Sequence, residues 1–137
     1  MNTSHTRLLV LLAVSFQCAS LARADETAYA KILKERDSVL AQIVVQREGR
    51  FATGTTSDEA LVAARVALWS FRRDTGPLKA EKIKQQKLIV AVFETRLEDL
   101  KRRMAAGIST DEDLLLARDA LLQAQQLLEE LKFVPHP

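Results

Sequence analysis

The sequence contains an internal repeat, and this feature restricts the possible folds more than any other. Ten positions between Arg50 and Leu68 recur with the same residue type 53 residues later, between Arg103 and Leu121. The recurring residues are Arg50, Ala52, Gly54, Asp58, Glu59, Leu61, Ala64, Arg65, Ala67 and Leu68. A match at a fixed offset indicates two copies of one supersecondary unit. The chain is therefore predicted to fold as two equivalent units.

Each copy joins a helix stop to a helix start. Gly54 and Gly107 are predicted to end helices, because glycine readily adopts the positive φ found just beyond a helix C-terminus. A few residues later each copy has a Ser or Thr followed by Glu at the spacing of a capping box. The predicted turn and capping residues are Gly54, Thr56 and Glu59 in the first copy and Gly107, Ser109 and Glu112 in the second.

Apolar residues spaced three and four apart predict helices over 26–52, 57–73, 77–106 and 110–132, with no strand. The segment Thr75-Gly76-Pro77 separates the second helix from the third, with Gly76 suited to a helix end and Pro77 to a helix start. The predicted fold class is all-α. Two antiparallel αα-hairpins, 25–75 and 76–132, form a four-helix bundle or an elongated coiled coil, and 133–137 form an extended tail.

Apolar stripes identify the expected core. The third helix has a heptad alternation and the fourth an unbroken three-four rhythm, so these two helices are predicted to pack together antiparallel. Their stripes are Val90, Phe93, Leu97, Leu100 and Met104, and Leu114, Ala117, Leu121, Ala124, Leu128 and Leu131. The first helix carries two adjacent stripes, Leu33, Leu40, Val44 and Phe51, and Ile32, Val39 and Ile43. Trp69 is predicted to anchor the core rather than to bind a ligand.

Residues 1–24 have the features of a secretory signal. An apolar run from Leu8 to Phe16 precedes Ala22-Arg23-Ala24, which fits a cleavage site. Cleavage near Ala24 predicts a periplasmic or secreted protein without a transmembrane span. The alternative is lipid modification of Cys18, although Ser15-Phe16-Gln17 is a poor match to a lipidation motif. The whole chain has a net charge of +2, and loss of Arg7 and Arg23 would balance its charges, so charge gives no reason to infer nucleic acid.

The residue types needed for catalysis and metal binding are scarce. The mature chain would keep one histidine, His136, and no cysteine. These residues cannot supply a nucleophile–base pair or a histidine–cysteine metal cluster. The sequence therefore predicts a protein that is not an enzyme, with no metal or cofactor.

The second copy resembles the helix-turn-helix signature of TolC-like outer-membrane efflux proteins. The matching residues are Arg103, Gly107, Ser109, Asp113, Leu114, Ala117, Arg118 and Leu121, and the first copy matches with Arg50, Gly54, Leu61, Ala64, Arg65 and Leu68. The resemblance covers about twenty residues in each copy, and the strands of an outer-membrane barrel are missing from the pattern. Ala60 stands where the motif usually has an acidic residue. Convergence on a well-capped hairpin is the alternative explanation.

The resemblance implies periplasmic hairpins whose turns face other coiled-coil proteins. On that basis the predicted partner-binding residues, which flank the apolar seams near the turns, are Arg50, Arg65, Arg103, Asp113 and Arg118. The alternative for these charges is that they only stabilise helix ends, since basic residues near a helix C-terminus and acidic ones near an N-terminus suit the helix dipole.

Three functions are compatible with these features. The first is an envelope interaction module that binds a coiled-coil envelope protein through its turns or sides. The second is a periplasmic stress-sensor or chaperone-like bundle, although the Leu-Thr-x-x-Gln motifs of such proteins are absent. The third is self-association with a structural role.

Overall fold

The computed structural model describes residues 4–133, with side chains from residue 27 onward, and this part of the chain is helical without strands. The elements are α1 (Ser4–Ala52), α2 (Asp58–Thr75), α3 (Lys79–Ala105) and α4 (Asp111–Phe133). The predicted all-α fold is thus confirmed, and its turns lie at Gly54, Gly76 and Gly107. The side chains of the predicted signal segment lie outside the described residues. Phe133, predicted to begin the extended tail, belongs to α4, and the rest of that tail lies outside the described residues.

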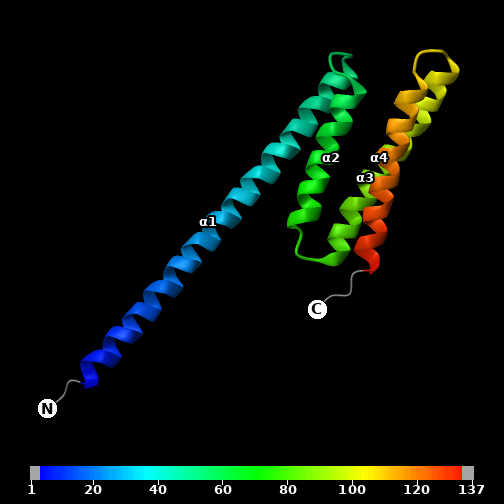
Figure 1. Cartoon of the computed structure of the whole chain (residues 1–137). Coiled ribbons are helices and arrows are strands. Elements are labelled where there is room, and N and C mark those ends of the chain that lie inside the picture. Colours follow the sequence, from blue (N-terminus) through cyan, green and yellow to red (C-terminus); the bar gives the residue numbers. More distant parts are fainter. Residues whose placement is uncertain (1–3, 134–137) are drawn as a thin grey trace. The chain divides into compact units, whose positions relative to one another are not determined.

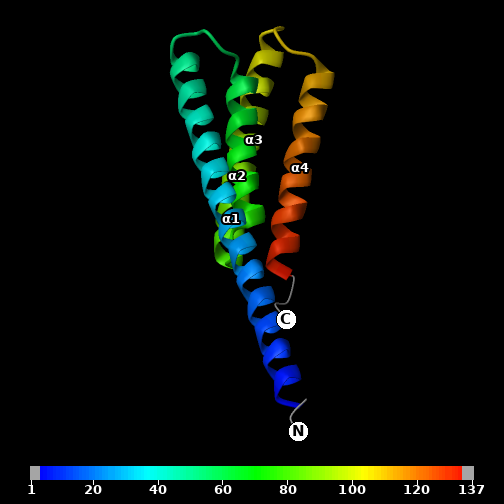
Figure 2. The ribbon, with the colours of Figure 1, turned by 90° about the vertical axis from the view of Figure 1, so that its left-hand side faces the viewer.

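The chain divides into two compact units, residues 1–38 and residues 39–137. The first unit contributes the beginning of α1, and the second contains both turns of the repeat. Within the second unit, α2 packs against α3 and α3 packs against α4. Figures 1 and 2 show that the α1–α2 turn and the α3–α4 turn lie at the same end of this unit, which we call the tip end.

The hydrophobic core lies between α2, α3 and α4. Its buried centre consists of Ile89, Val90, Leu121 and Ala124. Val66, Trp69, Phe93, Leu97 and Leu128 pack around this centre. The predicted seam between α3 and α4 is confirmed, and so is the placement of Trp69 against the core. Close packing of these three helices is the main source of stability for elements of this length.

The two predicted apolar stripes of α1 differ in how far their side chains are buried. Val44, on the first stripe, is buried. On the second stripe Ile32, Val39 and Ile43 are exposed at 60%, 49% and 39% of their surface. Leu33 and Leu40 of the first stripe are half-buried, but Phe51 at its end is 45% exposed, so burial of this stripe is confined to its middle.

The connection between α2 and α3, which contains Gly76, lies at the end opposite the tips, as Figure 1 shows. Gly76 caps α2 with φ −64° and ψ 131°, so it does not need the positive φ of the other two turn glycines. A Cβ atom there would lie 2.8 Å from the carbonyl oxygen of Arg72. Glycine is therefore required at this position because the backbone of Arg72 comes too close for a side chain. Pro77 precedes the next helix rather than starting it, because Leu78 is the N-cap of α3.

Candidate interaction site at the hairpin tips

The two tip turns end their first helices in the same way. In each turn the glycine N–H donates to the carbonyl three residues back, and the next N–H donates to the carbonyl five residues back. These bonds are Gly54–Phe51 at 3.0 Å and Thr55–Arg50 at 2.8 Å, and Gly107–Met104 at 2.9 Å and Ile108–Arg103 at 2.8 Å. Gly54 and Gly107 have φ 70° and 72°. Both turns are therefore Schellman motifs, and both predicted glycine caps are confirmed.

Each turn also provides an N-terminal cap for the helix that follows it, but the two caps are not identical. The hydroxyl oxygen of Ser57 accepts a bond from the N–H of Ala60 at 3.2 Å. At the equivalent place in the second turn, the hydroxyl oxygen of Thr110 accepts from the N–H of Asp113 at 3.1 Å. The Asp113 carboxylate in turn accepts from the N–H of Thr110 at 3.0 Å. The second turn has a complete capping box, whereas Ala60 leaves the first with half of one.

These caps lie one residue later than the sequence predicted. The predicted N-caps, Thr56 and Ser109, have other partners: Thr56 accepts a bond from Arg47 at 3.2 Å, and Ser109 donates to Asp113 at 3.1 Å. Glu59 and Glu112 are exposed in the first turns of α2 and α4 and do not close the boxes. The capping residue must lie directly before the helix with an extended backbone, and Ser57 satisfies this before Asp58 with φ −78° and ψ 155°.

Asp113 was predicted to contact a partner, but the second turn holds its carboxylate. The N–H of Thr110 is the largest cause that lowers the pKa of Asp113 below its usual value. The hydroxyls of Thr110 and Ser109 lower this pKa further, desolvation raises it, and the charge of Arg103 is the last of the causes that lower it. The carboxylate is thus charged at neutral pH and engaged in shaping the tip, which makes Asp113 primarily a capping residue.

The predicted partner-binding arginines fall into two groups. Arg65 donates from two nitrogens to a carboxylate oxygen of Glu48, at 2.8 and 3.2 Å, and so joins α2 to α1. In the second copy Lys101 occupies the position of Glu48, so Arg118 lacks the equivalent acid. Arg118, Arg50 and Arg103 are exposed, and among the side chains that the structure describes none of the three takes part in an ion pair.

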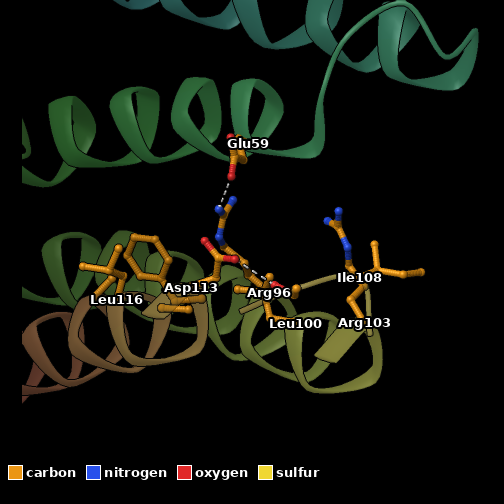
Figure 3. Close-up of a pocket in the computed structure, with 11 residues that line it drawn as sticks. Glu59, Arg96, Leu100, Arg103, Ile108, Asp113 and Leu116 are labelled. Atoms are coloured by element: carbon orange, nitrogen blue, oxygen red, sulfur yellow. Dashed lines mark hydrogen bonds and ion pairs between the residues drawn. The ribbon is translucent and has the colours of Figure 1, made fainter. Parts of the chain in front are cut away.

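A hollow of about 340 Å³, here named the tip groove, lies between the start of α2 and the tips of α3 and α4. Figure 3 shows Glu59 above it and Arg96 reaching from α3 toward Glu59, while Asp113 and Arg103 also lie below Glu59, with Arg103 near Ile108. Arg96 donates to Glu59 at 2.8 Å. The apolar part of the lining consists of Phe93, Leu100, Ile108, Leu116, Ala117 and Ala120. The tip groove therefore combines an apolar surface with Arg96, which is paired with Glu59, and Arg103, whose charge acts on Asp113.

Sequence reasoning missed two polar links between the hairpins. One is the Arg96–Glu59 ion pair at the tip groove. The other is Gln86, the most buried described polar side chain at 1% exposure, which accepts a bond from Arg73 and donates to the carbonyl of Ala124, both at 2.7 Å. The signal for Gln86 was present, because it lies four residues before Val90 and extends the heptad stripe of α3.

The described residues include no group of three or more His, Cys, Asp or Glu side chains placed to hold a metal ion. Within the same part of the chain, no helix has the length and apolar character needed to cross a membrane. Comparison of the chain with protein-family models, with curated proteins and with solved structures finds no match.

Proposed function

We propose that this chain is an exported, non-catalytic interaction module of the cell envelope, whose hairpin tips dock on a coiled-coil protein. The observation that carries the proposal is the construction of the tips. Two turns with the same Schellman geometry lie at one end of the same compact unit, beside a groove with apolar lining. Rigid, well-capped turns present side chains to a partner with little loss of conformational entropy on binding.

The charges at the tips support this proposal. Arg50 and Arg103 occupy equivalent positions at the ends of α1 and α3, and both are exposed without an ion pair among the described side chains. Arg118 adds a third such charge on α4. The apolar side chain of Ile108, exposed at 68%, lines the tip groove together with Arg103. A partner helix with apolar and acidic residues would complement this surface, since charge complementarity steers association and apolar contact stabilises it.

The resemblance of both turns to the hairpins of TolC-like proteins, which face coiled-coil adaptors, agrees with this type of partner. Export is proposed from the apolar run and the Ala22-Arg23-Ala24 sequence.

The test is capture of partners from envelope extract with the wild-type protein and with an Arg50→Ser/Arg103→Ser/Arg118→Ser variant. This set leaves out Asp113, because changing a capping residue would confound binding with stability. A Lys84→Ser/Lys87→Ser/Lys132→Ser variant, on exposed positions of α3 and α4 away from the tips, serves as the charge-matched control. We expect a captured coiled-coil protein to bind the purified wild type in isolation, with an affinity that falls as salt rises, and to bind the arginine variant more weakly. Equal binding by wild type and arginine variant would contradict the proposal.

A further inference from the structure

The tip groove differs from the equivalent part of the first hairpin in its side chains. The two turns have the same backbone geometry, with φ 70° and 72° at their glycines. At three positions of the lining the residues are more apolar than their counterparts at the repeat offset of 53: Leu100, Ile108 and Leu116 stand where the first copy has Arg47, Thr55 and Ala63. In the first copy Arg47 donates to Thr56 across the turn at 3.2 Å. The second hairpin thus has an apolar hollow where the first has a polar link.

The apolar lining of the tip groove runs from a buried floor to an exposed rim. Leu100 and Ala117 at the floor are buried, whereas Ile108 and Leu116 at the rim are 68% and 63% exposed. Figure 3 shows Ile108 and Leu116 toward opposite ends of the hollow, with Leu100 between them. Its volume of about 340 Å³ is at the lower end of the range of about 300–1,000 Å³ for binding pockets. The hollow therefore suits one or two large side chains of a partner rather than a whole helix.

Arg103 places a positive charge in this lining. It is the last of three consecutive basic residues near the end of α3, and the first two are engaged with acids on the same helix. Lys101 pairs with Glu98 at 2.7 Å and Arg102 with Asp99 at 3.4 Å. Among the side chains that the structure describes, Arg103 takes part in no such ion pair, and it lines the tip groove instead.

The other three charged groups of the lining have polar partners of their own. The Asp113 carboxylate accepts bonds from the N–H and the hydroxyl of Thr110 at 3.0 and 2.8 Å, and the charge of Arg103 is the last of the causes that lower its pKa. Glu59 and Arg96 pair with each other at 2.8 Å. The Arg103 guanidinium is therefore the group of this lining that can best bind a carboxylate from another molecule, and two parallel hydrogen bonds make such a contact strong.

We propose that the tip groove binds a helix of the partner that inserts a large apolar side chain between Ile108 and Leu116 and presents a carboxylate to Arg103. This inference rests on the proposed docking at the tips, and it adds which tip makes the selective contact and which residue pattern that tip selects. An acidic residue one turn from an apolar residue meets both requirements, since residues three or four apart share one face of a helix. The first tip, with Arg47 and Thr55 at the equivalent positions, makes no equivalent contact.

Binding of a synthetic peptide to the full chain tests this pattern. The probe is a fluorescent amphipathic helical peptide in which a leucine has a glutamate one turn away on either side, and fluorescence anisotropy measures its binding. One control peptide has alanine in place of the leucine, and the other has glutamine in place of both glutamates. The alanine peptide should bind about 10-fold more weakly than the probe, as expected for loss of an apolar anchor. The glutamine peptide should also bind more weakly, and its affinity should change less with salt. Equal binding of the three peptides, or no binding of the probe, would overturn the proposal.

Two pairs of variants, each checked for wild-type helicity, locate the probe on the protein. Leu116 and Leu115 are neighbours on α4 with exposures of 63% and 64%, but of the two only Leu116 lines the tip groove. Leu116→Ser should weaken binding of the probe about 10-fold, and Leu115→Ser should leave it unchanged. The second pair fills the hollow: Ala120→Leu should weaken binding, whereas Ala67→Leu, at the equivalent position of the first copy, should not. An equal effect within both pairs would place the probe elsewhere and overturn the proposal.

Failure of this inference can be told apart from failure of docking at the tips. If the probe result fails while the arginine variant still loses the captured partner, the tips dock without using the groove, and only this inference is overturned. If wild type and arginine variant capture partners equally, docking itself is contradicted, and this inference is contradicted with it.

Discussion

Replacing Gln86 should destabilise the protein much more than replacing its neighbour Gln85. The Gln86→Met substitution keeps the side-chain volume but removes the bonds to Arg73 and Ala124. Gln85 differs, because among the described residues its buried side-chain oxygen has no hydrogen-bond partner. Gln85→Met therefore removes a buried acceptor that the fold leaves unused.

The magnitude is set by the two bonds. A hydrogen bond to a charged group contributes about 1.5–3 kcal/mol and a neutral one about 1 kcal/mol. The side chain of Arg73 is exposed at 17%, so in the variant it can form a hydrogen bond with water, and the Ala124 carbonyl keeps its helical bond. The total loss should therefore lie near the lower end of the sum of the two contributions. We expect Gln86→Met to lower the free energy of unfolding by about 2 kcal/mol. Gln85→Met should leave this free energy unchanged or raise it slightly.

Urea denaturation followed by helical circular dichroism measures both variants. With a slope of about 1.5 kcal/mol per molar urea, the midpoint for Gln86→Met should fall by roughly 1 M. Coincident unfolding curves for the two variants would show that the buried link between the hairpins contributes nothing, and the reasoning about the core would be refuted.

Three further predictions concern the turns and the N-terminus. Gly107→Val should lower the melting temperature, because a β-branched residue is strained at φ 72°. Gly49→Ala should raise it, since Gly49 lies inside a helix with open space around it and Ala is favoured there by about 1 kcal/mol. Equal melting temperatures for the two variants would show that Gly107 is not a constrained cap. The pKa of Asp113 is depressed in the folded protein, so the contribution of this carboxylate to the free energy of unfolding should be complete above the ordinary carboxyl pKa and be lost as the pH falls through the folded pKa. The stability difference between wild type and Asp113→Asn should therefore vanish in acid. A difference that does not change with pH would speak against a charged cap. N-terminal sequencing of exported protein should begin at Asp25, and a chain that begins at Cys18 would support lipid modification instead.

The sequence predicted the tip turns well because their signals are local. Gly54 and Gly107 had to adopt positive φ, and few other residues do so readily. The N-caps were placed one residue early because Thr56-Ser57 and Ser109-Thr110 each offer two hydroxyls in succession. Only the position at which the helix begins decides between them.

The contacts between hairpins were less predictable, because they depend on which apolar face of each helix is used. The two stripes of α1 look equivalent in sequence, yet Val44 is buried and Val39 is exposed. Gln86 breaks an otherwise apolar seam, and its role emerges only when Arg73 and Ala124 are brought beside it. The use of Asp113 as a cap likewise depends on turn geometry rather than on residue type.

Site-specific photo-crosslinking in the native host tests the proposed docking at the tips most directly. A photoreactive residue at Ile108 is compared with one at Val45 of α1, since these side chains are exposed at 68% and 66% but only Ile108 lines the tip groove. We predict that Ile108 crosslinks to a coiled-coil envelope protein, that Val45 does not, and that the crosslink weakens when Arg103→Glu is added. The same products from both positions, or a crosslink indifferent to Arg103, would contradict docking through the tips.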